Sequence, residues 1–164
     1  MQERPIWQTA LLCVRLRGIS ILRPSDEVMA YWLVKSEPGS WSWQDQTKVG
    51  ATNWDGVRNP QATSFLRSMR KGDRVFFYHS GDERQIVGVV EVVKEFYPDP
   101  KDTSGRFGMV DLKTVTELPK PVTLAAVKAE KRLANLALVK QSRLSVMPID
   151  ETSWKLISRM GGLT

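Results

Sequence analysis

The sequence is poor in the two side chains that most often hold metals or form cross-links. It contains one cysteine, Cys13, and one histidine, His79. A single cysteine excludes a disulfide within the chain and a cysteine-cluster zinc site. Since no carboxylate-rich loop has the spacing of a known metal site either, we expect no metal and no cofactor.

Long apolar runs and phosphate-binding glycine motifs are also missing. No stretch approaches the roughly 18 apolar residues that a membrane helix needs, so we expect no membrane span. Neither G-x-x-x-x-G-K-[ST] nor G-x-G-x-x-G occurs, which argues against a dedicated triphosphate or dinucleotide site. We expect a cytoplasmic protein, because the scarcity of cysteine agrees with a reducing compartment. We also expect the protein to be a monomer.

What the chain does have is positive charge. Its 164 residues carry a formal net charge of +6, with 41% hydrophobic and 26% charged residues. This composition is typical of one globular domain with a real core. A basic balance favours an anionic partner, with nucleic acid first, while a merely soluble surface is the plainer interpretation.

The first 28 residues differ from the rest of the chain. Their apolar bursts are interrupted by Arg15, Arg17 and Arg23, whereas a secretory signal needs an unbroken apolar stretch of about 7–15 residues. We expect residues 1–28 to be a poorly ordered extension, with Met29 as the natural start. Residues 29–164 would then form the domain.

From residue 30 onward, strand-like segments dominate the middle of the chain. We expect strands over 30–35, 51–55, 74–80, 85–97, 108–118 and 143–149, from their β-branched and aromatic content. Pro119 and Pro121 should end the fifth of these. Helices are expected after the N-cap residues Ser40 or Ser42, Asn59, Thr123 and Asp150, with a further helical stretch over 131–138. The pattern indicates an α+β fold, a small and mostly antiparallel barrel with helices packed on it, since closure removes exposed edges.

One enzymatic hypothesis centres on the single histidine. His79 would act as base for a serine nucleophile, with Glu37 or Asp55 as orienting acid, on a nucleoside or a small ester. The candidate nucleophiles are Ser36, Ser80 and Ser145. The G-x-S-x-G context of many hydrolases is absent, so a structural role for His79 is the competing interpretation.

Aromatic residues beside polar groups suggest a binding site instead. Trp32, Trp54, Tyr78 and Tyr97 lie in or next to strand-like segments and could enclose a planar ring whose edge is read by polar neighbours. The alternative is that they fill the core. The basic residues that could contact phosphates are Arg67, Arg70, Lys71, Arg106 and Arg143, with Arg74, Lys94 and Lys101 nearby.

Six blocks of sequence resemble a known family. They are YWLVKSEP (31–38), WDGVRN (54–59), FFYHS (76–80), YPDP (97–100), PVTL (121–124) and RLSVMPI (143–149). Their order and spacing resemble the EVE domain, and in particular stand-alone bacterial EVE proteins, over about residues 30–161. The resemblance implies a PUA-like fold, a small mixed or antiparallel β pseudo-barrel with surrounding helices.

The same resemblance implies a function. EVE domains are related to the YTH domain, which holds a methylated adenine in an aromatic cage, and they have no established catalytic activity. The expected activity is that of a nucleic-acid reader that accepts a flipped or unpaired modified base, either a modified cytosine in DNA or a modified RNA nucleotide.

The matching blocks also imply a set of pocket residues. These are Trp32, Lys35, Ser36, Glu37, Trp54, Val57, Arg58, Asn59, Tyr78, His79 and Ser80, with Tyr97 and Ser145 as further contributors. Two features depart from the family pattern. The loop after YPDP, KDTSGRFG, is shorter than in many relatives, and residues 1–28 have no counterpart in it.

Overall fold

The computed structural model describes residues 12–16, 19–23 and 29–164. Strands β1 (Leu12–Leu16) and β2 (Ile19–Arg23) pair antiparallel with each other. The remainder of the expected N-terminal extension lies outside the described residues.

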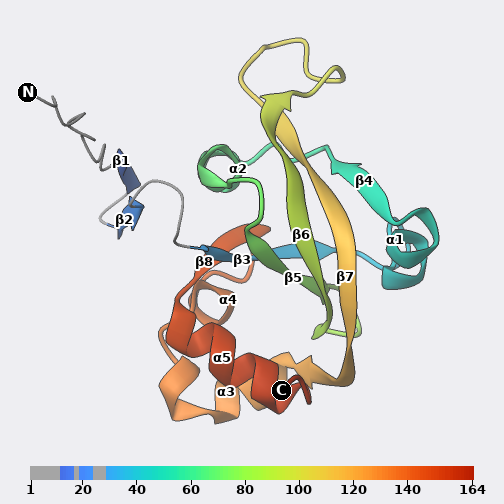
Figure 1. Ribbon diagram of the computed structural model, residues 1–164, viewed down its shortest axis with the longest axis vertical. Helices are drawn as coiled ribbons and strands as arrows, with labels where there is room; N and C mark the ends of the chain where they lie inside the picture. The colour runs from blue at the N-terminus through green and yellow to red at the C-terminus, as the bar shows by residue number, and fades with distance from the viewer. Residues whose placement is uncertain (1–11, 17–18, 24–28) are drawn as a thin grey trace, which may run out of the picture.

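A six-stranded sheet forms the centre of the molecule, in the order β4-β7-β6-β5-β3-β8 (Figure 1). The strands are β3 (Tyr31–Ser36), β4 (Ala51–Trp54), β5 (Arg74–His79), β6 (Gln85–Pro98), β7 (Gly108–Thr123) and β8 (Val146–Ile149). β3 pairs parallel with β5, and the other neighbours pair antiparallel. The sheet is therefore mixed, and β6 and β7 form a long hairpin that extends beyond the other strands (Figure 1).

The expected α+β class, a mixed sheet with surrounding helices, is confirmed, but the expected closure into a barrel is wrong. In the described part of the chain the sheet stays open, with β4 and β8 at its edges. Each edge strand is only 4 residues long, and helices lie beside them, α1 against β4 and α2 and α4 against β8. Short edges covered by helices remove exposed hydrogen-bonding groups without closure.

Five α-helices occur in the described residues, namely α1 (Trp43–Val49), α2 (Pro60–Ser68), α3 (Leu124–Ala129), α4 (Ala137–Lys140) and α5 (Glu151–Met160). The expected N-caps are confirmed, with Ser42 as the choice for α1. Its side chain accepts a hydrogen bond from the third helical N–H, as do those of Asn59, Thr123 and Asp150. The helical stretch expected over 131–138 is instead a 3₁₀ turn, Lys131–Leu133, followed by α4.

The two prolines do not end β7, contrary to expectation. β7 runs through Pro119 and Pro121 to Thr123. Its pairing with β6 shifts register between Ile86 and Gly88, opposite this segment. A proline lacks the N–H that a regular ladder requires, and it is tolerated where the ladder is irregular.

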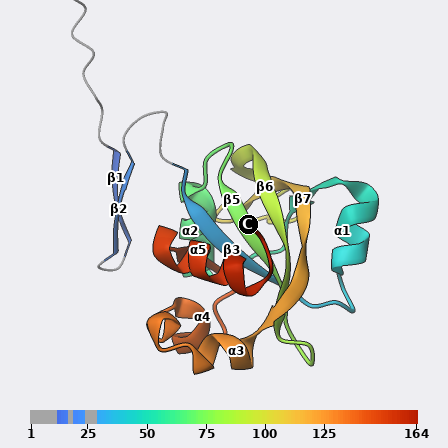
Figure 2. The same cartoon turned by 60° about the horizontal axis from the view of Figure 1, so that its bottom comes forward.

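The core lies between the sheet and its helices. α5 covers the β3–β5 region (Figure 2), where Trp154 stacks on Phe76 with ring centroids 3.8 Å apart and on Tyr31 at 4.6 Å. At the opposite end, Trp43 packs so closely on Gly88 that an added Cβ would lie 2.3 Å from its ring. These contacts fix β3 and its neighbours β5 and β6, and the end of β3 contributes to the site described below.

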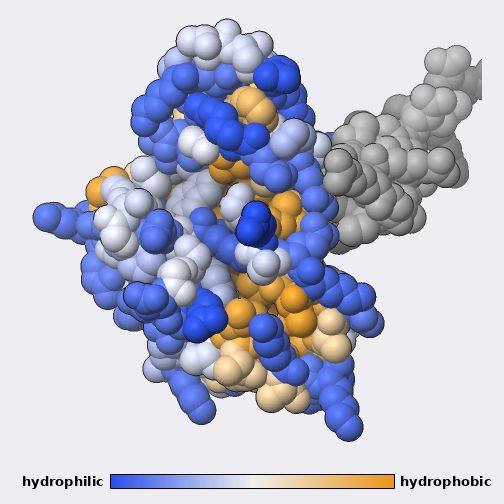
Figure 3. Space-filling view, turned by 180° about the vertical axis from the view of Figure 1, so that it is seen from behind, coloured by the Kyte–Doolittle hydropathy of each residue, from blue (hydrophilic) through white to orange (hydrophobic). Residues whose placement is uncertain are grey.

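The outer surface is predominantly hydrophilic on the face shown in Figure 3, with an apolar patch in its lower half. None of the helices in the described residues is long and apolar enough to cross a membrane.

Candidate functional site

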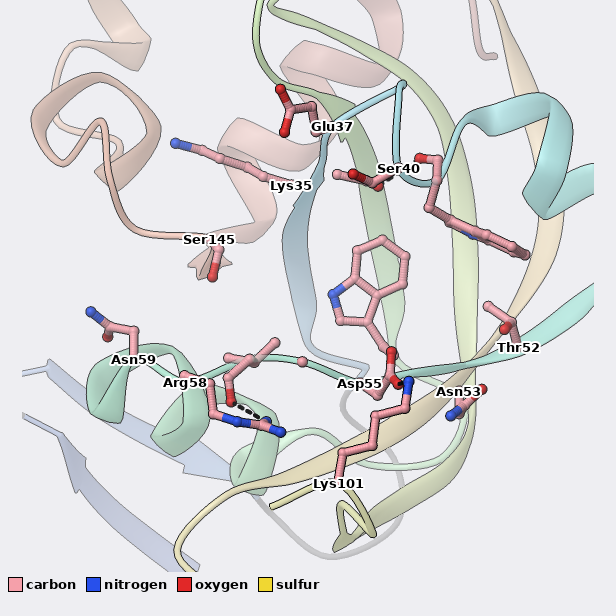
Figure 4. Close-up of a pocket in the computed structure, with 15 residues that line it drawn as sticks. Lys35, Glu37, Ser40, Thr52, Asn53, Asp55, Arg58, Asn59, Lys101 and Ser145 are labelled. Atoms are coloured by element: carbon pink, nitrogen blue, oxygen red, sulfur yellow. Dashed lines mark hydrogen bonds and ion pairs between the residues drawn. The ribbon is translucent and has the colours of Figure 1, made fainter. Parts of the chain in front are cut away.

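A pocket of about 710 Å³ opens beside the carboxyl ends of β3 and β4 (Figure 4). We call it the central pocket. Its lining residues come from the end of β3 and the turn after it, from β4 and the loop to α2, and from two more distant loops. They are Lys35, Ser36, Glu37, Ser40, Trp41, Thr52, Asn53, Trp54, Asp55, Gly56, Val57, Arg58, Asn59, Lys101 and Ser145.

A buried carboxylate holds the loop between β4 and α2. Asp99, whose side chain is fully buried, accepts hydrogen bonds from the backbone N–H groups of Gly56 (3.1 Å) and Lys101 (2.8 Å) and from Arg58 Nη1 (2.9 Å). Burial alone would raise the pKa of Asp99, but these hydrogen bonds and the Arg58 charge outweigh it and hold the pKa below its ordinary value. Gly56 takes φ of 76°, a left-handed conformation that favours glycine. The WDGVRN block thus has a defined geometry.

The indole of Trp54 stands at the boundary between core and pocket. Its side chain packs edge-on against Phe77, with ring centroids 5.5 Å apart, and only 9% of its surface is exposed. Val57, on the same loop, is 8% exposed. These two residues give the pocket an apolar wall at its base.

The opening of the pocket carries an ion pair. Lys101 Nζ lies 2.6 Å from the Asp55 carboxylate, and the two side chains meet beside the pocket in Figure 4. The hydrogen bond to Asp55 raises the pKa of Lys101. Because the lysine side chain is 74% exposed, solvent screens this pair, and it contributes little to stability.

Lys35 is a different kind of cation. Burial lowers the pKa of this lysine, since a half-buried ammonium loses hydration. Its Nζ donates to the Ser142 carbonyl oxygen at 2.9 Å and lies 5.7 Å from the centre of the Tyr78 ring. No carboxylate forms an ion pair with it among the described residues.

Most of the pocket residues expected from the sequence lie together. Those that line the central pocket are Lys35, Ser36, Glu37, Trp54, Val57, Arg58, Asn59 and Ser145. Trp32 does not, and its expected place in the pocket needs correction. It is fully buried, and its indole N–H donates to Asp73 at 2.9 Å.

The β5 block, Tyr78 to Ser80, does not line the pocket either. Tyr78 and His79 are each 3% exposed. His79 Nε2 accepts a hydrogen bond from the Trp43 backbone N–H at 2.9 Å, so Nδ1 carries the proton and donates to Glu83 at 2.6 Å. Both ring nitrogens are therefore engaged in holding α1 and the β5–β6 turn. This arrangement gives no support to the hydrolase hypothesis.

Tyr97 also lies outside the central pocket. Its hydroxyl hydrogen-bonds to Asp111 on β7, and Lys94 Nζ lies 3.8 Å from its ring centroid. Burial and the hydrogen bond to Asp111 raise the pKa of Tyr97 to about 12. Tyr97 therefore contacts residues of the β6–β7 hairpin and does not line the base of the pocket.

The candidate phosphate contacts divide among three places. Arg143 lines a second hollow of about 290 Å³, which shares Asn59 with the central pocket and also contains Lys140. We call it the side hollow. Arg67 lies at the far end of α2, where it donates to the Arg106 carbonyl oxygen and lies over the Phe96 ring. Arg106 is exposed in the loop between β6 and β7, and Arg70 and Lys71 are exposed in the turn before β5.

Sequence reasoning missed several lining residues. Trp41 and Ser40 follow the first matching block, while Thr52 and Asn53 belong to β4. Lys140 of the side hollow was missed as well. A cluster of tryptophans directly after a matching block was the available signal for Trp41, whereas nothing in the sequence shows which loop residues fold back onto the site.

Comparisons with known proteins find a matching family model and similar folds. The family model of the EVE domain matches residues 30–160. Human thymocyte nuclear protein 1 is 33% identical over 163 residues, covering 78% of this chain and 72% of the human protein. The solution structure of Rpa0253 from Rhodopseudomonas palustris is 54% identical, with a TM-score of 0.78 over 82% of this chain and 94% of that one. A crystal structure of human THYN1 in complex with DNA containing 5-methylcytosine is 30% identical, with a TM-score of 0.76 over 83% of this chain and 99% of that one.

Proposed function

Because this chain belongs to the EVE domain family, we propose that it is a non-catalytic nucleic-acid reader whose central pocket accepts a modified base, with modified cytosine in DNA as its ligand class. The single observation that carries the proposal is the pocket itself, walled by Trp54 and Val57 and edged by polar groups. The THYN1 structure with DNA containing 5-methylcytosine supports the choice of ligand.

The size and chemistry of the pocket support a base-sized guest. Its volume of about 710 Å³ falls within the roughly 300–1,000 Å³ of small-molecule sites, which combine apolar walls with a few polar groups. A nucleobase presents two apolar faces and a polar edge, and this pocket has complementary surfaces for both.

Energetics require an unstacked nucleotide. Stacking on an aromatic side chain contributes about 1–3 kcal/mol per base, while flipping a base out of a duplex costs a few kcal/mol. The two nearly cancel, so binding to a duplex needs phosphate contacts or a weakened base pair. Single-stranded nucleic acid avoids that cost.

The side hollow supplies a path for the backbone. It lies next to the central pocket, with Asn59 between them, and Lys140 and Arg143 both line it. A nucleotide whose base occupies the central pocket can place a neighbouring phosphate against these two cations. Such contacts add affinity without reading sequence.

Fluorescence anisotropy with a single-stranded oligonucleotide that carries one central 5-methylcytosine tests the proposal. Trp54→Ala removes the aromatic wall, so we expect affinity to fall by about 5- to 150-fold, the equivalent of about 1–3 kcal/mol. Lys128→Ala is the control, since this exposed residue on α3 lines neither hollow.

Circular dichroism establishes that both variants are folded. Equal losses for the two variants would mean that Trp54 contributes no more to binding than a surface lysine does, and the proposal would then be wrong.

A further inference from the structure

One hydrogen-bond donor in the central pocket has no partner in the protein. The Trp54 indole N–H donates to no acceptor among the described residues, whereas the Trp32 N–H is bonded to Asp73. In that same part of the chain, the enclosed side-chain polar atoms without a partner are Trp43 Nε1 and Thr63 Oγ1. Trp54 Nε1 is not among them, so it reaches accessible space. Since its residue is 91% buried and lines the pocket, that space is the pocket.

Two further donors belong to the same pocket. Lys35 Nζ uses one N–H for the Ser142 carbonyl, which leaves two for a ligand. The Asn59 side-chain oxygen is occupied as the cap of α2, where it accepts from the Ala62 N–H, while its amide nitrogen has no acceptor among the described residues. Figure 4 shows Lys35, Asn59 and Ser145 around one side of the opening.

Two carboxylates of the pocket region are already engaged. The carboxylate of Asp55 is paired with Lys101, and Asp99 behind the loop is fully engaged. Glu37 is exposed at the rim. The Ser36 hydroxyl donates its hydrogen bond to the Trp41 carbonyl oxygen, so it can only accept a hydrogen bond from a ligand. The side-chain donors left for a ligand are therefore those of Lys35, Trp54 and Asn59, from β3, β4 and the start of α2.

We propose that the central pocket reads the acceptor edge of a cytosine-type base, its O2 and unprotonated N3, with the Trp54 indole N–H as a reading donor, and that it rejects thymine. This inference rests on the proposed function. 5-Methylcytosine and thymine carry the same methyl group at the same position. They differ at N3, which is an acceptor in cytosine and a protonated donor in thymine, and at position 4, which is an amino group in one and a carbonyl in the other.

The discrimination follows from unpaired groups. Opposite a donor, thymine N3–H leaves two N–H groups buried without acceptors. Each unpaired buried polar group weakens binding by about 5- to 150-fold. The methyl group alone distinguishes modified from unmodified cytosine only by about fourfold. Selection against thymine is therefore expected to be the steeper of the two.

The test compares three single-stranded oligonucleotides of one sequence that carry 5-methylcytosine, thymine or cytosine at the central position. Anisotropy titrations of the wild-type protein should show at least about fivefold tighter binding of 5-methylcytosine than of thymine. Trp54→Phe keeps an aromatic ring but removes the N–H. We expect it to lose about 2- to 12-fold in affinity for 5-methylcytosine, the value of one hydrogen bond, and little for thymine, so that the ratio shrinks.

Trp154→Phe is the matched control, because it makes the same change on α5, outside the pocket, and should keep the wild-type ratio. Lys35→Met is a second variant that removes a different donor and should also reduce the ratio, which keeps the test decisive if Trp54→Phe does not fold.

The inference is overturned if wild-type protein binds thymine as tightly as 5-methylcytosine, or if the folded donor variants keep the full ratio. In those cases tighter binding of both methylated bases than of cytosine would leave the proposed function standing. Binding that ignores the central base and survives Trp54→Ala would instead remove the proposed function.

Discussion

Asp99 is the residue on which the geometry of the pocket loop depends. It is fully buried, yet it is ionised and bonded to two backbone N–H groups and to Arg58. The Arg58 side chain is 39% exposed, so water can hydrate its guanidinium. The Asp99 carboxylate is fully buried and depends on its hydrogen bonds within the protein. Loss of its charge should therefore loosen residues 55–58.

Asp99→Asn tests this role at nearly constant shape. At pH 7 we expect the free energy of unfolding to fall by about 1–3 kcal/mol, the cost of weakening hydrogen bonds to a buried charge, measured by urea denaturation. The folded pKa of Asp99 is lowered, so its contribution is present above the ordinary carboxyl pKa and is lost as pH falls through the lowered value. The difference between wild type and variant should thus shrink in acid.

Asp82→Asn, in the exposed β5–β6 turn, serves as control and should change the unfolding free energy little at either pH. A difference for Asp99→Asn that stays constant from neutral to strongly acidic solution would contradict the account of an ionised, stabilising carboxylate.

Individual residues also mark where sequence reasoning succeeds and where it fails. Trp54 and Trp32 look alike in the sequence, each an aromatic residue in a strand that is followed within a few positions by polar residues. Only the packing of other elements on each face decides that Trp54 borders the pocket while Trp32 is enclosed beside Asp73. The chemistry of local blocks was therefore predictable, whereas the side of the sheet on which each aromatic lies was not.

At the scale of elements, the start of α2 combines two roles in one side chain. The Asn59 oxygen caps the helix, and the amide nitrogen of the same group belongs to the pocket. The capping role was predictable from the Asn-Pro sequence. The pocket role depends on where the loop before α2 folds.

Two substitutions separate these roles. Asn59→Asp keeps a good N-cap, so we expect stability within about 0.5 kcal/mol of wild type, but it replaces a donor with a negative charge and should weaken oligonucleotide binding. Asn59→Ala loses the cap as well, at about 1 kcal/mol. Urea denaturation and anisotropy on the same samples measure both effects, and full binding by folded Asn59→Asp would remove Asn59 from the pocket's ligand contacts.

Element boundaries were less predictable than element types. The strands and capped helices between residues 30 and 160 were expected from periodicity and cap residues, but the continuation of β7 through Pro119 and Pro121 was not. A proline predicts a strand end only where the ladder is regular, and the register shift in β6–β7 is a tertiary feature. The prediction of a closed barrel was wrong because it also depended on a tertiary feature. Helices beside β4 and β8 protect the sheet edges without closure.

At the scale of the whole molecule, the pocket lies where three distant segments meet. β3 and β4 contribute the wall and the edge donors, the β6–β7 loop contributes Asp99 and Lys101, and the loop before β8 contributes Ser145. The end of β3 and the loop that starts α2 line the same pocket. A net charge of +6 then favours an anionic ligand over the whole surface, while the pocket supplies selectivity.

The most direct test of this account is NMR observation of the tryptophan indole N–H signals during titration with the single-stranded oligonucleotide containing 5-methylcytosine. We predict that the Trp54 signal shifts as the ligand binds, because its N–H opens into the occupied pocket, while the enclosed Trp43 signal stays in place. Saturable binding with an unchanged Trp54 signal would contradict the central claim, because it would mean that the nucleic acid binds elsewhere on the protein.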